Sequence, residues 1–200
     1  MDRADAIFAP IVRNPALLLS ILVLCLLPAC GATPIHKAGE RMWTANLEYG
    51  RPTRGKTLAW TGLGSADTYS ISGSNYWFLS DRLSMGTGLT LTAFDQKDGW
   101  VSAVEPEALL RWHFAETEKV SFFVDGAVGF LYASKRVPEN STPWNFTFSF
   151  GPGMELPLND HLKFITKFEF HHLSNAKGRK SLENESQNEG RFTIGIGMTW

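Results

Sequence analysis

The sequence predicts an all-β protein: an eight-stranded antiparallel transmembrane β-barrel preceded by a signal peptide. Three observations lead to this fold class. The 200-residue chain contains 14 Phe, 7 Trp and 18 Gly, and short segments rich in glycine and aromatic residues are typical of β architecture. An apolar leader stands at the N-terminus. Apolar and polar residues alternate through the rest of the chain, without a sustained helical period.

The leader has the order of a secretory signal peptide and is assigned to residues 1–32. Two arginines precede a largely apolar run at 16–27, and small residues follow. The run is too short for a comfortable transmembrane helix. The segment "LPAC" at 27–30 also resembles a bacterial lipobox, in which Cys30 would be acylated. Residues 33–200 are assigned to the barrel.

Composition excludes several classes of function. Both cysteines, Cys25 and Cys30, lie in the leader, so the mature chain has neither a disulfide nor a thiol-based catalytic or metal site. The formal net charge of -1 implies no general attraction to nucleic acid.

Eight strands are predicted from the alternation. They span residues 42–50, 67–80, 83–96, 101–114, 119–133, 143–157, 161–174 and 191–200. Short polar turns are expected at 80–82, 116–119 and 158–160, and long connections at 51–66, 134–142 and 175–190. Short turns at one end and longer loops at the other are typical of an outer-membrane barrel.

The last strand shows how a membrane barrel is recognised. Apolar residues alternate with small or polar ones over 191–200, and the chain ends on Trp200, which resembles the assembly signal of bacterial outer-membrane proteins. Strand 119–133 alternates too, although Phe123 breaks its pattern. A closed barrel is the only sheet that pairs every backbone group in a bilayer, and eight strands leave a lumen filled by side chains. A soluble barrel or sandwich anchored through Cys30 is the alternative, but aromatic residues at strand ends favour membrane girdles.

Strand 161–174 carries the candidate chemistry at its outer end. Its odd positions include two lysines and a glutamate and are expected to face the lumen with His171, whereas its even positions form an aromatic stripe that faces lipid. His172 and Ser174 continue that stripe. Because the termini of an even-stranded barrel are periplasmic, this end lies at the cell surface. A histidine beside a serine suits a Ser–His nucleophile, although polar residues are also ordinary where a strand leaves the membrane.

The segment "HLSNA" at 172–176, near the end of such a barrel, resembles the lipid A 3-O-deacylase family, the PagL-type outer-membrane acyloxyacyl hydrolases. The resemblance implies an esterase without metal or cofactor. Ser174 would attack the ester carbonyl of the acyl chain at position 3 of lipid A. His172 would take and return the proton, and Asn175 would help to form the oxyanion hole. The released product would be a 3-hydroxy fatty acid.

The triad acid is where the chain departs from this family. Family members commonly continue with N-x-G and place a glutamate two residues after the glycine. Here "NEGRF" at 188–192 puts Phe192 at that position. Glu183, Glu185 and Glu189 are the nearby substitutes. Glu189 is closest to the final strand and is the expected acid, although solvated loop charge is the ordinary role of such residues.

Further expectations concern the partners. Lys177 and Arg179 lie just beyond the motif and are expected either to pair with lipid A phosphates or to act as ordinary loop charges. The resemblance implies lipopolysaccharide as the substrate and the bacterial outer membrane as the location. A homodimer is left open. The alternative function is a non-catalytic eight-stranded barrel with a structural or surface-binding role.

Overall fold

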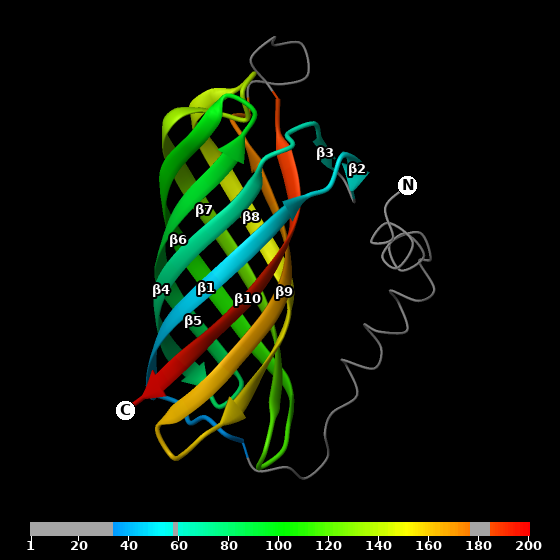
Figure 1. Cartoon of the computed structure of the whole chain (residues 1–200). Coiled ribbons are helices and arrows are strands. Elements are labelled where there is room, and N and C mark those ends of the chain that lie inside the picture. Colours follow the sequence, from blue (N-terminus) through cyan, green and yellow to red (C-terminus); the bar gives the residue numbers. More distant parts are fainter. Residues whose placement is uncertain (1–33, 58–59, 177–184) are drawn as a thin grey trace.

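The computed structural model describes residues 34–57, 60–176 and 185–200, and it confirms the predicted fold class. Eight long strands form one closed antiparallel barrel in the order β1-β10-β9-β8-β7-β6-β5-β4 (Figure 1). The strands are β1 (Arg41–Pro52), β4 (Asp67–Ser80), β5 (Leu83–Gln96), β6 (Gly99–Glu116), β7 (Ser121–Val137), β8 (Thr142–Pro157), β9 (Leu162–Ser174) and β10 (Gln187–Thr199). The predicted leader, residues 1–32 with its lipobox, lies outside the described residues.

Closure is made by β1, which pairs with β10 on one side and with β4 on the other. The β1–β10 register runs from Met42 opposite Thr199 to Pro52 opposite Glu189. The C-terminus lies at the same end of the barrel as the start of β1 and the short turns (Figure 1). The longer connections gather at the opposite end, which we call the loop end.

Two differences from the predicted elements affect the site. The predicted loop 51–66 contains a hairpin of β2 (Gly55–Thr57) and β3 (Trp60–Gly62), which lies outside the barrel wall near β10 (Figure 1). Strands of three residues are too short to show alternation in the sequence. In addition, β10 begins at Gln187 rather than at 191, because residues 187–190 extend its ladder against the outer end of β9.

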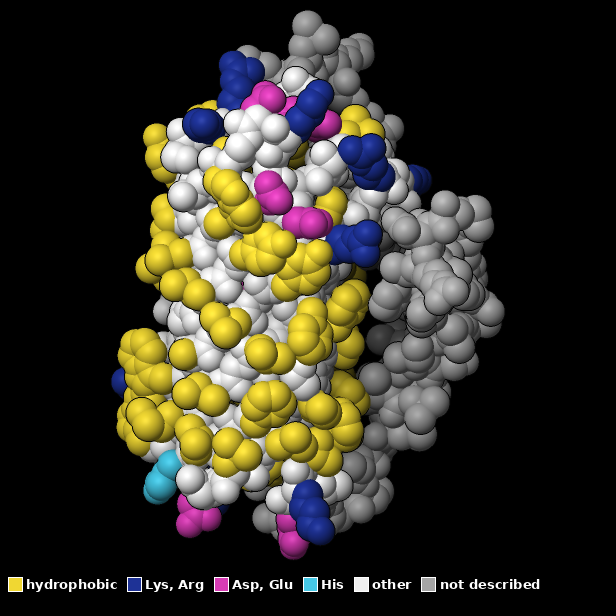
Figure 2. All heavy atoms as spheres, in the orientation of Figure 1, with side chains coloured by type: hydrophobic (Ala, Val, Ile, Leu, Met, Phe, Trp, Pro, Cys, Tyr) yellow, Lys and Arg dark blue, Asp and Glu magenta, His cyan; other side chains and the backbone are white. Residues whose placement is uncertain are grey.

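The outer wall of the barrel is apolar. Large side chains such as Leu47, Ile71 and Val128 are exposed on it, at 59%, 55% and 57%. Figure 2 shows hydrophobic side chains over the height of the wall, with most of the charges towards the two ends. A soluble barrel would bury this face, whereas a membrane barrel turns it to lipid. Within the described residues, no helix has the length and apolarity needed to cross a membrane.

The lumen is filled by paired charges and aromatic rings. In the half of the lumen nearer the short turns, the Nε atom of Arg111 lies 2.6 Å from Asp125 Oδ1, and its Nη1 atom lies 2.6 Å from Glu155 Oε1. The guanidinium also packs over the rings of Phe123 and Tyr76, 3.9 and 4.5 Å from their centroids. Phe123 breaks the alternation of its strand because it faces inward and covers this cation. Buried charges persist only when they are paired in this way.

The half of the lumen nearer the loop end holds a second network of ion pairs, which bears on the predicted site. Glu189 Oε1 lies 2.9 Å from His171 Nδ1 and 2.8 Å from Arg191 Nη2. Arg191 also pairs with Glu48 at 3.3 Å, and His171 pairs with Glu105 at 3.4 Å. The prediction that His171 faces the lumen is therefore confirmed.

Candidate active site at the loop end

The last residues of β9 place two neighbouring histidines on opposite sides of the barrel wall. His171 is fully buried in the lumen network. His172 points outward, as the alternation predicts, yet it is only 6% exposed. A polar ring on a lipid-facing surface needs both cover and a hydrogen-bond partner, and the structure supplies each from a different segment.

The hydrogen-bond partner of His172 is Asn188, which stands directly opposite it on β10. The Nδ1 atom of His172 lies 2.7 Å from the Oδ1 atom of Asn188. A carbonyl oxygen can only accept, so the imidazole must donate through Nδ1–H. Its Nε2 atom then carries the lone pair, which is the tautomer a general base requires.

The β2–β3 hairpin fixes which way the Asn188 amide points. The Nδ2 atom of Asn188 donates to the backbone carbonyl of Trp60 at 3.1 Å and approaches that of Gly55 at 3.5 Å. These contacts leave Oδ1 for His172. The close approach depends on Gly62, because a Cβ atom there would lie 2.6 Å from the Asn188 backbone nitrogen. The hairpin therefore sets the tautomer of His172 through Asn188.

The cover of His172 is the indole of Trp60. Its centroid lies 5.5 Å from the His172 ring, 6.0 Å from Phe170 and 5.6 Å from Phe148. The three partners face outward on β8 and β9, where Phe148 stands opposite His172. Trp60 thus forms a roof over the histidine on the outside of the wall.

Ser174 lies on the same outward face two residues beyond His172, at the end of β9. It is half-buried, and its hydroxyl makes no hydrogen bond to any described residue. The backbone then turns sharply, since Ala176 has a φ of 57°. A non-glycine residue in this region is uncommon and is favoured only where the surrounding structure demands it. The turn ends the strand directly after the serine and its neighbour.

Asn175 is buried, and its Nδ2 atom donates to Ser141 Oγ at 3.2 Å, which ties it to the turn between β7 and β8. Asn175 also makes an interaction besides this hydrogen bond. Asn175 therefore lies next to Ser174 in the chain while its side chain reaches towards β8.

The structure does not bring the expected acid, Glu189, to His172. Glu189 points into the lumen, where it pairs with His171 and Arg191. The position beside His172 is occupied by Asn188. The substitute Glu185 instead accepts a hydrogen bond from the Asn140 backbone at 3.3 Å. Glu183, Lys177 and Arg179 lie outside the described residues.

The alternation contains a signal that identifies Asn188. Phe192 and the other even residues of β10 face outward, and Asn188 belongs to the same set once the strand is extended to Gln187. Glu189 shares the lumen face with Arg191 for the same reason. Trp60 has no comparable signal, because its strand is only three residues long and its contact with β9 is made across distant parts of the chain.

A broad hollow lies elsewhere on the outer wall. It has a volume of about 850 Å³ and is lined by apolar side chains including Leu47, Ile71 and Ile194. Its lining belongs to the face that meets lipid, and it contains none of the polar residues at the loop end. It is accordingly a depression for bilayer chains rather than part of the candidate site.

Comparisons place this fold among small outer-membrane β-barrels. No protein-family model matches the chain, and no curated protein matches it. Neisserial surface protein A (NspA) has a TM-score of 0.60 at 12% identity, covering 80% of this chain and 98% of that one. The outer-membrane enzyme PagL has a TM-score of 0.58 at 15% identity, covering 76% and 97%. The N-terminal β-barrel domain of Pseudomonas aeruginosa OprF has a TM-score of 0.50 at 14% identity, covering 81% and 99%. At sequence identities this low, the structural likeness establishes a shared fold and nothing more specific.

Proposed function

We propose that this protein is an outer-membrane esterase that removes the 3-O-linked 3-hydroxyacyl chain from lipid A. The observation that carries the proposal is the hydrogen bond from His172 Nδ1 to Asn188 Oδ1, which leaves Nε2 as a base on the same outward face of β9 as Ser174. The outward, lipid-facing position of these residues suits a substrate that lies in the outer leaflet. The likeness to PagL, described as an outer-membrane enzyme, supports the same class of activity.

The reaction proceeds through an acyl-enzyme. Ser174 Oγ attacks the ester carbonyl carbon while His172 Nε2 takes the hydroxyl proton, and a tetrahedral oxyanion forms. Asn175 is proposed to help stabilise that oxyanion. His172 then gives the proton to the departing sugar oxygen. A water molecule, activated by the same imidazole, releases the 3-hydroxy fatty acid and restores Ser174.

Asn188 replaces the acid of a Ser–His–acid triad in this proposal. It holds the tautomer and orientation of His172, as an acid would, but it has no negative charge to stabilise the imidazolium formed in the transition state. Slower turnover than that of a carboxylate triad follows from this difference. Lys177 and Arg179 are proposed to meet the lipid A phosphates.

A non-catalytic barrel is the second candidate function. Two observations favour it: the third residue is an amide, and the Ser174 hydroxyl makes no hydrogen bond to His172. In that case, Trp60 and the polar residues that it contacts would have only a structural role, at the end of the barrel wall near the membrane interface.

Mass spectrometry of lipid A separates the two functions. Cells that make the wild-type protein should lose one 3-hydroxyacyl group from lipid A, and cells that make Ser174→Ala should keep it. Ser102→Ala, at an exposed outward position on β6, is the matched control and should behave as wild type. Heat-modifiable migration on a gel checks that each barrel is folded. Intact lipid A in cells that contain folded wild-type protein would support the non-catalytic barrel.

A further inference from the structure

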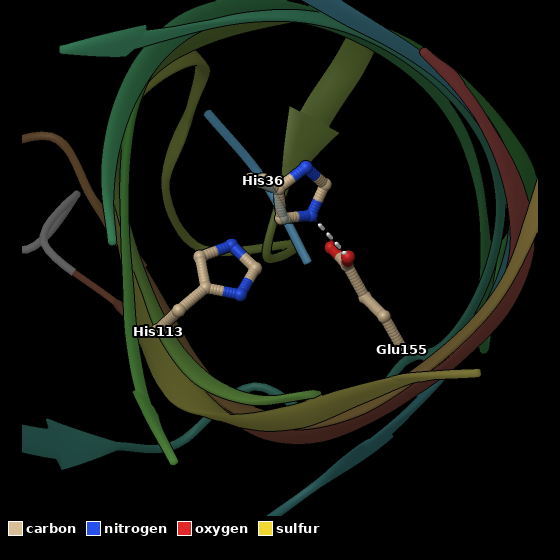
Figure 3. Close-up of side chains that lie close together, drawn as sticks. All are labelled: His36, His113 and Glu155. Carbon is tan, nitrogen blue, oxygen red and sulfur yellow. Dashed lines mark hydrogen bonds and ion pairs between the residues drawn. The ribbon is translucent and has the colours of Figure 1, made fainter. Parts of the chain in front are cut away.

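A cluster of potential metal ligands lies in the lumen at the end of the barrel opposite the candidate active site. His36 precedes β1, His113 lies on β6 and Glu155 lies on β8 (Figure 3). All three side chains are fully buried, at 0% exposure. One potential ligand atom from each lies within 4.8 Å of the other two.

His36 is held by a carboxylate on each side of its ring. Its Nδ1 atom lies 3.0 Å from Glu40 Oε2, and its Nε2 atom lies 2.8 Å from Glu155 Oε2. Figure 3 shows the second contact across the lumen. The other oxygen of Glu155 is occupied by Arg111 Nη1 at 2.6 Å. Glu155 therefore offers one oxygen to the cluster.

His113 has one nitrogen anchored and one without a partner. Its Nδ1 atom lies 2.7 Å from Ser121 Oγ, and that hydroxyl donates its hydrogen to Glu116 Oε1 at 3.2 Å. The serine oxygen must then accept from His113 Nδ1–H. The Nε2 atom consequently carries a lone pair, and it is buried without a hydrogen-bond partner among the residues that the structure describes. Such an orphaned acceptor has a free-energy cost unless another group satisfies it.

We propose that His36, His113 and Glu155 bind a zinc ion through Nε2, Nε2 and Oε2. Two imidazoles and one carboxylate are a common ligand set for Zn²⁺, with water as a fourth ligand. Each histidine also has the outer contact typical of zinc sites, in which the far nitrogen donates towards a carboxylate. Glu40 supplies that contact directly, and Glu116 supplies it through Ser121.

The spacing requires only small adjustment to accept the ion. Zinc–ligand distances of about 2.0–2.2 Å at tetrahedral angles put neighbouring ligand atoms roughly 3.3–3.5 Å apart. The His36–Glu155 pair, now at 2.8 Å, would open slightly, while the widest separation, at most 4.8 Å, would close. Both movements are within the reach of side-chain rotation.

A protonated His36 that pairs with Glu40 and Glu155 is the competing explanation. It accounts for the two carboxylates around His36 but leaves His113 Nε2 unpartnered. A zinc ion satisfies all three groups at once. The ion would join the segment before β1 to the walls formed by β6 and β8, and so fasten that segment inside the barrel end.

Zinc binding by the full chain, folded in detergent and without a histidine tag, tests this proposal. After treatment with a chelator, the protein is dialysed against Zn²⁺, and its metal content is measured by mass spectrometry. We expect one zinc per chain, with a Kd of about 1 µM or below, and a higher unfolding temperature with zinc than without. X-ray absorption at the zinc edge should show two imidazole ligands.

His113→Gln is the decisive variant, because it removes the orphaned nitrogen and leaves the His36–Glu155 contact in place. We expect its zinc affinity to fall by at least ~100-fold, with heat-modifiable migration retained. His161→Gln is the matched control: His161 lies at the same end, is exposed and is outside the cluster. Its zinc affinity should equal that of wild type. A folded wild-type barrel without stoichiometric zinc, or equal zinc binding by His113→Gln, would overturn the proposal.

Discussion

The Nδ1 atom of His172 lies 2.7 Å from the Oδ1 atom of Asn188 on the adjacent strand. This contact decides the chemistry available at the loop end. It fixes the imidazole as an Nδ1–H donor with a free Nε2, and it puts an amide where a triad acid would otherwise stand. The orientation of the amide depends in turn on the backbone carbonyl of Trp60, in a hairpin outside the barrel wall.

Removal of the Asn188 side chain should reduce the proposed esterase activity. In Asn188→Ala, the His172 ring loses the acceptor that holds its tautomer, and we expect kcat to fall by about 10²- to 10⁴-fold. Asn188→Asp keeps an acceptor at the same place and should retain more activity than Asn188→Ala. The measurement is the release of 3-hydroxy fatty acid from purified lipopolysaccharide. Equal kcat for Asn188→Ala and wild type would remove Asn188 from the mechanism.

A methyl group at Gly62 should disturb the site without unfolding the barrel. The new Cβ would lie 2.6 Å from the Asn188 backbone nitrogen, so the hairpin must move away from β10. The Trp60 carbonyl would then no longer orient the amide, and turnover should fall roughly 10-fold or more. Gly73→Ala is the control, because its Cβ would meet only the Thr44 carbonyl at 3.7 Å. Unfolding in urea should be the same for both variants, and identical turnover would contradict the role of the hairpin.

Loss of the Trp60 indole should expose His172 to reagents. The ring lies 5.5 Å from His172, whose exposure is only 6%. In Trp60→Ala, we expect the imidazole to react several-fold faster with diethyl pyrocarbonate, as measured by mass spectrometry of the peptide that contains it. Trp77→Ala removes an exposed indole elsewhere on the wall and should leave this rate unchanged. An unchanged rate in Trp60→Ala would mean that other groups cover the histidine.

Glu189→Gln should affect stability rather than catalysis. Its carboxylate pairs with His171 and Arg191 in the lumen, on the other side of the wall from His172. We expect the free energy of unfolding to decrease by about 1.5–3 kcal/mol, the range for hydrogen bonds to charged groups. The expected esterase turnover stays within a few-fold of wild type. Urea titration in lipid or detergent, together with fatty-acid release, checks both. A loss of turnover as large as that of Asn188→Ala would restore Glu189 as the triad acid.

The sequence by itself determined the barrel and the faces of its strands. Alternation has a period of two, so a long strand such as β9 reveals which residues turn outward, and His172 and Ser174 were placed correctly by this rule. Local patterns are sufficient there because each strand contains its own signal. The same rule assigns Asn188 and Glu189 to opposite faces once β10 is known to begin at Gln187.

The tertiary structure alone decided which residues meet. The register of β9 against β10 puts Asn188 beside His172, and the hairpin brings Trp60 over both from far away in the chain. The cluster of His36, His113 and Glu155 likewise joins three distant segments. Contacts of this kind depend on register, loop path and closure of the barrel, which are set by many residues together and leave no local pattern in the sequence.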